Sequence, residues 1–226
     1  MANTERPIVV TNDLDGVHFY TPPPLDTTLR LLRGKLSLPE EVQAIQEYIP
    51  PAGFVNTILA RLFILFHQYR PLIPGALRGL QRFREVGDTH GREVVFAVLS
   101  GRKKDKHGVT LRILERAGYS QYFTQWLLNE GDSPVVWKEF QTRRLVDQGY
   151  SVVHLEDDLR AGLCVARAGI QFGEDHRVLV YLLKNLSNHP RLLRRAGITI
   201  PGNLVSVGNF QEACEDFDKR LSSGAL

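Results

Sequence analysis

The stretch IVVTNDLDGV, residues 8–17, joins a β-branched run to two aspartates and a glycine. The β-branched run is typical of a buried strand. Asp13 and Asp15 follow it one residue apart, and alternate residues of an extended chain lie on the same side. Two like charges so close together raise each other's pKa, and a bound cation would relieve their repulsion. The alternative is a polar strand end that turns at Gly16, as many strands do where they meet loops.

The composition is that of a globular protein. A chain of 226 residues accommodates one large domain, or a domain with an insertion. Its net charge of +3 is too small to indicate a nucleic-acid partner, and we expect none. The two cysteines, Cys164 and Cys214, lie in apolar, helix-like stretches. We expect them to be buried free thiols in a reducing compartment.

The sequence predicts neither a membrane span nor a signal peptide. The first ten residues, MANTERPIVV, lack the apolar core of a signal peptide. The most apolar window is 54–70, where Asn56 and Arg61 interrupt a run that falls short of the ~20 apolar residues of a membrane helix. We therefore expect a buried helix there and a cytoplasmic protein with no membrane partner. Nothing in the sequence indicates the oligomeric state.

Short apolar runs alternate with amphipathic segments along most of the chain. The runs are nearly continuous in Val, Ile and Leu, which is typical of strands covered on both faces. Their alternation with helical segments predicts an α/β fold with a Rossmann-like, doubly wound parallel sheet. The predicted strands are 8–10, 94–99, 152–155, 178–182 and 204–207, and the predicted helices are 74–86, 108–118, 138–150 and 159–170.

Residues 21–73 interrupt this alternation. The proline-rich TPPPLD leaves the first strand, and Ser37 and Glu40 then form a capping-box pattern at the start of a helix. A strongly apolar helix-like segment follows before the chain returns to the α/β pattern. We expect a helical cap at 21–73, inserted into a core formed by residues 1–20 and 74–226. The alternative is a set of crossover helices that pack directly on the sheet.

Several polar residues follow the predicted strands, where ligands of an open α/β sheet bind. They lie at or next to the carboxyl ends of three strands, which meet at the same edge. We therefore expect them to converge on one site. The groups concerned are Asp13 and Asp15, Ser100 with Gly101, Lys138, and the acidic residues 156–158.

These motifs, taken in order, resemble those of the haloacid dehalogenase superfamily, whose members are mostly magnesium-dependent phosphatases. The matching features are DLDGV at 13–17, Ser100 at the end of an apolar strand, Lys138 ahead of the third strand, and EDD at 156–158. The match spans residues 8 to 170, and the insertion lies where the superfamily places its first type of cap. The resemblance implies a magnesium-dependent phosphatase that acts on a small phosphorylated metabolite.

The resemblance also implies the roles of the acidic residues. Asp13 would be the nucleophile that forms an aspartyl-phosphate. Asp15 would protonate the leaving alcohol and then activate water. Mg²⁺ prefers oxygen ligands, and the carboxylates of Asp13 and Asp157 with the backbone carbonyl of Asp15 would hold it. Asp158 would bind the metal directly or through a water. Glu156 could be a surface turn carboxylate, and we place it outside the direct ligands of the metal.

The phosphoryl group would be bound by Ser100, by Lys138 and by amides near Gly101, which we place at the start of the next helix. Each residue also has a plainer interpretation. Ser100 could cap that helix, and Lys138 could be a solvated helix residue. The charge run at 102–107 is typical of a solvated loop.

The sequence departs from the family pattern at two places. Asn12 precedes the nucleophile where an apolar or aromatic residue is common, and no further acid follows Asp158 within EDDLRAGL. His18 and Tyr20 are candidates for a pocket on the cap side. Two other functions fit the motifs: a phosphomutase of the same superfamily, and a catalytically idle phosphate-binding module. The presence of both Asp13 and Asp15 argues against the idle module.

Overall fold

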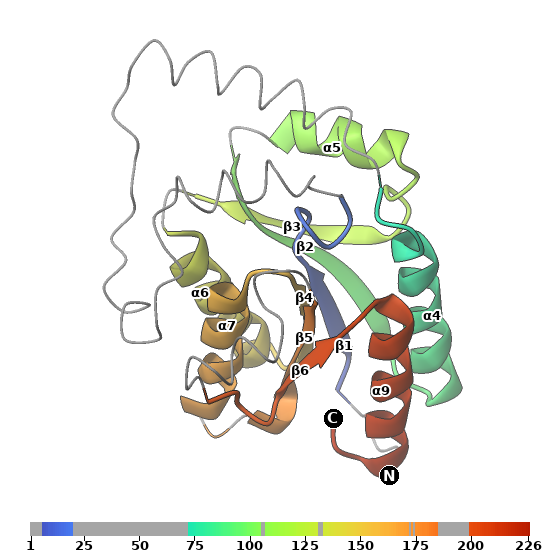
Figure 1. Cartoon of the computed structure of the whole chain (residues 1–226), viewed down its shortest axis with the longest axis vertical. Helices are drawn as coiled ribbons and strands as arrows, with labels where there is room; N and C mark the ends of the chain where they lie inside the picture. Colours follow the sequence, from blue (N-terminus) through green and yellow to red (C-terminus); the bar gives the residue numbers. More distant parts are fainter. Residues whose placement is uncertain are drawn as a thin grey trace.

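A computed structural model describes residues 6–19, 72–104, 107–130, 133–171, 173, 175–184 and 199–226. In these ranges six strands form one parallel sheet in the order β3-β2-β1-β4-β5-β6 (Figure 1). The strands are β1 (Ile8–Asn12), β2 (Val94–Lys103), β3 (Phe123–Asn129), β4 (Ser151–Glu156), β5 (Val178–Leu183) and β6 (Leu204–Val207). The predicted α/β fold with a Rossmann-like parallel sheet is confirmed.

Helices cover both faces of this sheet (Figure 1). One layer contains α4 (Ala76–Thr89), α5 (His107–Arg116) and α9 (Phe210–Ser223), and the other contains α6 (Pro134–Asp147) and α7 (Leu159–Gln171). A short 3₁₀ helix, η2 (Asp175–Arg177), leads into β5. The sheet is therefore doubly wound, with strand order reversing between β1 and β4.

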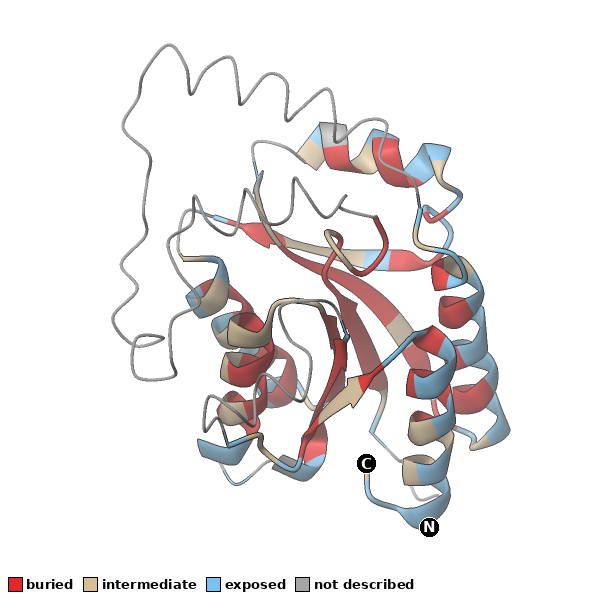
Figure 2. Ribbon diagram, in the orientation of Figure 1, coloured by how far each residue is buried: buried red, intermediate tan, exposed pale blue. Residues whose placement is uncertain are grey.

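The two faces of the sheet bury separate apolar layers because side chains alternate along each strand. In β1, Ile8 and Val10 pack in the same layer as Phe83 of α4. Val9 faces the other way and belongs to the layer that contains Leu163 of α7. Every residue of β1, β4 and β5 is buried (Figure 2). Burial on both faces explains the nearly continuous apolar runs in the sequence.

The sequence did not predict β3, which lies at the edge of the sheet beside β2. Its segment FTQWLLN is only partly apolar: Phe123 and Leu128 are buried, but Thr124 is exposed. An edge strand is less covered than a central one, so it lacks the continuous apolar run used to find the others. The five predicted strands and four predicted helices are confirmed, although α6 begins at Pro134 rather than at residue 138.

The two ends of the predicted insertion meet beside the end of β1. Phe19 and Leu72 form an antiparallel bridge, and the amide of Ile73 donates to the carbonyl of His18 at 2.8 Å. The chain therefore leaves and re-enters the described structure at one place, next to the motif that contains Asp13. The helical cap predicted at 21–73, including the apolar segment 54–69, lies outside the described residues apart from its last two positions, and it stays a prediction.

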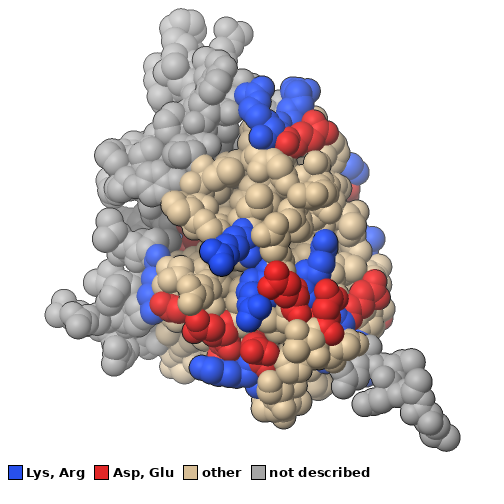
Figure 3. Space-filling model, turned by 90° about the vertical axis from the view of Figure 1, so that its right-hand side faces the viewer, with Lys and Arg blue, Asp and Glu red and all other residues tan. Residues whose placement is uncertain are grey.

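None of the helices in the described ranges has the length and apolarity needed to cross a bilayer. On the face that carries α4 and α9, basic and acidic side chains are interspersed (Figure 3). Some of them pair, as Arg82 does with Glu85 and Arg220 with Asp216. A face with mixed charges is unlike the one-sided basic patch typical of nucleic-acid binding.

Candidate active site

A buried ion-pair cluster lies at the carboxyl end of the sheet, where β1 and β4 are neighbours. The register pairs Asn12 with Leu155, so the next residues, Asp13 and Glu156, emerge side by side. The Nζ atom of Lys138, in the second turn of α6, lies 3.1 Å from Oδ1 of Asp13 and 2.6 Å from Oε2 of Glu156. All three residues are buried. Lys138 is therefore no solvated helix residue; it bridges two carboxylates from adjacent strands.

Glu156 has a hydrogen-bond donor for each of its four lone-pair sites. Its Oε2 accepts from Lys138 and from Nε2 of His154, at 2.6 and 3.0 Å. Its Oε1 accepts from the backbone amides of Asp157 and Asp158, both at 3.0 Å. An ionised carboxylate offers about four such sites. Glu156 therefore orients both the lysine and the loop after β4, and it could ligate a metal only by giving up one of these bonds.

His154 supports Glu156 from inside the sheet. Burial lowers the pKa of His154, so its imidazole is neutral. Because a carboxylate only accepts, Nε2 carries the proton, and Nδ1 accepts from the hydroxyl of Thr11 at 2.9 Å. Burial by itself would raise the pKa of Glu156, but the Lys138 charge and the His154 hydrogen bond hold it at about 2. Glu156 is therefore ionised at neutral pH.

Asp13 shares the Lys138 ammonium with Glu156, so its negative charge is only partly neutralised. Burial raises the pKa of Asp13 from 3.8 to about 7; Lys138 lowers it, and Glu156 and Asp15 raise it further. Burial would lower the pKa of Lys138, but the charges of Asp13 and Glu156 raise it above its ordinary range. One ammonium thus faces two buried carboxylates, and the excess negative charge favours a further cation.

Three carboxylates lie close enough together to hold a metal ion. Oxygen atoms of Asp13, Glu156 and Asp157 all lie within 4.8 Å of one another. Asp158 has another position: its Oδ1 accepts from the amides of Arg160 and Ala161, at 2.8 and 3.4 Å, at the start of α7. The structure thus brings Asp13 and Asp157 together as predicted, adds Glu156, and shows Asp158 as a helix cap. A role for Asp158 at the metal stays a prediction.

Asp15 turns to Arg102, a residue placed by sequence in a solvated loop. That placement is wrong for Arg102, because it belongs to β2 and its side chain is only 13% exposed. The arginine Nε donates to Oδ2 of Asp15 at 3.1 Å, and Nη2 donates to Oδ1 at 2.7 Å. Lys104, by contrast, is exposed and pairs with Glu130. The charge pattern of the sequence could not show which of these two residues is buried, because Arg102 and Lys104 both belong to the same run of charged residues.

Ser100 and Gly101 lie within β2, which continues to Lys103. The following α-helix, α5, begins at His107, so the expected start of a helix at Gly101 is wrong, and Ser100 does not cap one. Ser100 is buried, and its hydroxyl accepts from the amide of Arg102 at 3.3 Å. Gly101 lies against α6, since a Cβ there would come within 2.8 Å of Pro134. Phosphate binding by Ser100 and Gly101 stays a prediction.

Asn12 and His18 hold the loop that carries both aspartates. The Asn12 amide donates to the carbonyl of Val10 at 2.9 Å, and its Oδ1 lies 3.0 Å from Nε2 of His18. His18 is fully buried, packs edge-on against Tyr119, and has its pKa lowered by burial to about 3. It is therefore a neutral core residue rather than part of a pocket. Tyr20 lies outside the described residues.

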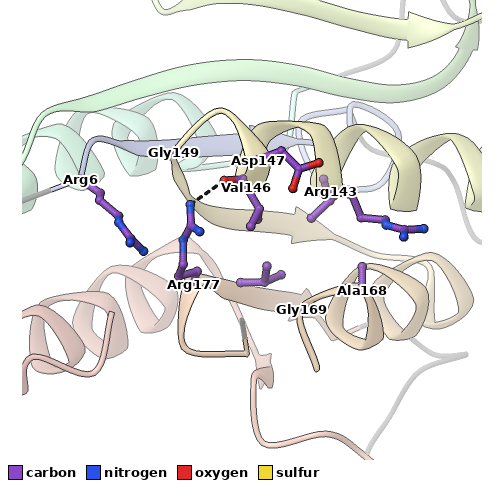
Figure 4. A pocket seen from close by; sticks show the side chains of 10 residues that line it. Arg6, Arg143, Val146, Asp147, Gly149, Ala168, Gly169 and Arg177 are labelled. Carbon is purple, nitrogen blue, oxygen red and sulfur yellow. Dashed lines mark hydrogen bonds between the residues drawn. The ribbon is translucent and has the colours of Figure 1, made fainter. Parts of the chain in front are cut away.

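A cavity of about 310 Å³ lies at the opposite, amino-terminal edge of the sheet (Figure 4). Arg6, Gly149 and Val178, which lie at or before the starts of β1, β4 and β5, help to line it. Arg177 extends there to the carbonyls of Val146 and Tyr150, at 2.6 and 3.0 Å, and so binds the end of α6. None of the clustered carboxylates lines this cavity.

Gly16 allows the first aspartate loop to approach Asp157. Its φ is +79°, and a Cβ there would collide with the carboxylate of Asp157. Gly91 has a similar φ of +67° but nothing within 4 Å, so it is a matched control. We expect Gly91→Ala to cost about 1–2 kcal/mol in unfolding free energy from backbone strain alone. Gly16→Ala should cost more, because the added methyl group displaces Asp157, and it should weaken any binding of Mg²⁺ to the acidic cluster. Urea unfolding would measure the unfolding free energy of both variants, and titration calorimetry would measure their metal binding. Equal unfolding costs for the two variants would contradict the close contact between Gly16 and Asp157.

The raised pKa of Asp13 predicts how stability depends on pH without metal. In the unfolded chain this carboxyl ionises near 3.8 and in the folded chain near 7, so ionisation destabilises the fold progressively as pH rises between these values. In excess chelator, Asp13→Asn should therefore be more stable than the parent at pH 8, by about 4 kcal/mol. The difference should vanish near pH 4. Urea unfolding across this range, with the exposed Asp88→Asn as control, would test it, and a difference independent of pH would count against the buried pairing.

No family model matches the chain, and neither does any curated protein sequence. Solved structures do match. A hydrolase described as a haloacid dehalogenase-like family protein from Streptococcus pneumoniae aligns with a TM-score of 0.59 and 11% identity, over 93% of this chain and 98% of that one. CbbY from Rhodobacter sphaeroides, solved in complex with phosphate, aligns with a TM-score of 0.52 and 16% identity, over 92% and 98%. The chain therefore has the haloacid dehalogenase-like fold.

Proposed function

We propose that the protein is a phosphatase that hydrolyses a small phosphorylated metabolite through an aspartyl-phosphate on Asp13. The observation that carries this proposal is the buried Asp13 carboxylate, 3.1 Å from the Lys138 ammonium at the carboxyl edge of the sheet. A buried carboxylate beside a fixed cation can act as a nucleophile toward phosphorus while the cation attracts the phosphoryl oxygens. The similarity of the fold to haloacid dehalogenase-like hydrolases supports the same function.

The clustered oxygens fit a hard divalent cation such as Mg²⁺. Asp13 and Asp157 offer carboxylate oxygens, and Glu156 adds a third within the same 4.8 Å. Mg²⁺ is bound by one or two carboxylates plus waters and phosphate oxygens, so this donor set suffices. We expect Asp13 and Asp157 to hold the ion, with the backbone carbonyl of Asp15. A bound Mg²⁺ would supply neutralisation of the charge on the phosphoryl oxygens.

The chain's own residues would carry the bond changes. A carboxylate oxygen of Asp13 forms a bond to phosphorus while the bond from phosphorus to the alcohol oxygen breaks. Asp15 gives its proton to that departing oxygen and later takes one from the water that hydrolyses the aspartyl-phosphate. Lys138 attracts a phosphoryl oxygen, and Ser100 donates its hydroxyl hydrogen to another. The products are inorganic phosphate, the alcohol and the free Asp13 carboxylate.

Phosphate release would test this function directly. Against a panel of phosphate monoesters, the protein should release phosphate with Mg²⁺ and lose that activity in excess chelator. Asp13→Asn should abolish turnover, because its amide cannot attack phosphorus, while circular dichroism shows an intact fold. Asp88→Asn, an exposed aspartate of α4, serves as the control and should retain activity.

Three results would contradict the proposal. Full activity in chelator would exclude the metal, and turnover by Asp13→Asn would exclude the covalent step. Isomerisation of a sugar phosphate without phosphate release would favour the phosphomutase instead. A cytoplasmic location and the absence of nucleic-acid and membrane partners remain part of the proposal.

A further inference from the structure

Arg102 makes a two-point contact with Asp15. Its Nε and Nη2 donate to separate oxygens of the carboxylate, at 3.1 and 2.7 Å. A paired contact of this kind defines the plane of the carboxylate as well as its position, because both oxygens are held. Asp15 is a third exposed, whereas Arg102 is largely buried. The partly exposed Asp15 carboxylate is therefore held by the side chain of a largely buried arginine.

The arginine is itself held from three directions. Its backbone belongs to β2 and is fixed by the sheet. Its Nη1 lies 3.4 Å from the hydroxyl of Thr110 in α5, and its guanidinium lies 5.8 Å from the centre of the Phe19 ring. Burial by itself would lower the pKa of Arg102, but the charge and hydrogen bonds of Asp15 raise it, so the group stays charged. A guanidinium with these contacts is a fixed charge rather than a mobile one.

The two aspartates of the first motif thus have separate cations. Lys138 pairs with Asp13, and Arg102 pairs with Asp15. Both oxygens of Asp15 are held by Arg102, whereas the Lys138 ammonium lies at Asp13 and Glu156. Each carboxylate oxygen accepts about two hydrogen bonds, so the contact with Arg102 does not by itself exhaust Asp15.

We propose that Arg102 is a positioning residue, which holds Asp15 apart from Asp13 and in the orientation from which it exchanges a proton with the leaving oxygen. This inference rests on the proposed function. In the step concerned, Asp15 first takes up a proton from solvent; the bond from phosphorus to the alcohol oxygen then breaks, and that proton passes to the oxygen. Arg102 keeps its charge throughout and bonds to neither reactant.

Two esters that differ in their leaving group would show whether Arg102 positions Asp15, or instead binds the phosphoryl group or supports the fold. p-Nitrophenyl phosphate releases a stable anion that needs no proton, whereas glycerol phosphate releases an alkoxide that does. The measurement is kcat/KM for both esters with the parent, Arg102→Gln, Arg102→Lys and the control Lys104→Gln. Lys104 lies two residues further along but is exposed and pairs with Glu130. Urea unfolding would verify that each variant is folded.

We expect Arg102→Gln to lose about 100-fold in kcat/KM on glycerol phosphate, the size of a general acid–base contribution, and under about tenfold on p-nitrophenyl phosphate. Arg102→Lys keeps the charge without the two-point contact and should fall between Arg102→Gln and the parent. Lys104→Gln should match the parent on both esters.

Equal losses on both esters in a folded variant would overturn the inference, because they would mean that Arg102 binds the phosphoryl group or supports the fold generally. Parental activity of Arg102→Gln on glycerol phosphate would overturn it as well. In both cases an active parent enzyme leaves the proposed function intact. A parent protein inactive toward the whole panel of phosphate monoesters would instead overturn the proposed function and this inference together; if the parent hydrolyses another alkyl ester of the panel, that ester takes the place of glycerol phosphate.

Discussion

The ammonium group of Lys138 lies buried between two carboxylates, and the rest of the site depends on that contact. Parallel pairing of β1 with β4 brings Asp13 and Glu156 into the same water-poor space, where unpaired charges are costly. Breaking a buried ion pair by removing one partner typically costs about 3–5 kcal/mol. Burial raises the pKa of Asp13, and the one positive charge of Lys138, shared with Glu156, offsets this only in part. The excess negative charge that remains favours a metal ion.

Glu156 links this cluster to the backbone around it. Its carboxylate receives bonds from the lysine, from His154 and from the two amides that follow β4, so one side chain orients α6, the interior of the sheet and the loop with Asp157. That loop lies against Gly16, whose missing side chain allows the close approach. The clustered carboxylate oxygens are therefore placed by contacts among buried groups, which are screened little by solvent.

The two aspartates of the first motif lie in different environments, which would suit them to the different roles proposed for them. Asp13 is buried and shares its cation, whereas Asp15 is partly exposed and has a two-point contact with Arg102. Groups of one type that lie two residues apart can serve as nucleophile and as acid–base catalyst when their surroundings differ. Asp15 is held by Arg102 of β2, which contacts Thr110 of α5, and Asp13 is held by Lys138 of α6, so different elements support the two aspartates.

The local pattern of the sequence determined the central strands, the helices between them and the polar residues at the strand ends, because hydrophobic periodicity and strand-end chemistry are local properties. It missed β3, whose half-covered edge position leaves a mixed pattern, and it placed Gly101 at the start of a helix that begins at His107. Only the tertiary structure decided which charges are buried. Arg102 and Lys104 belong to the same charge run, yet Arg102 is largely buried and Lys104 is exposed. Glu156 and Asp158 belong to the same acidic motif, yet Glu156 is buried and Asp158 is partly exposed. Burial depends on contacts between residues far apart in the chain, and no local pattern contains them.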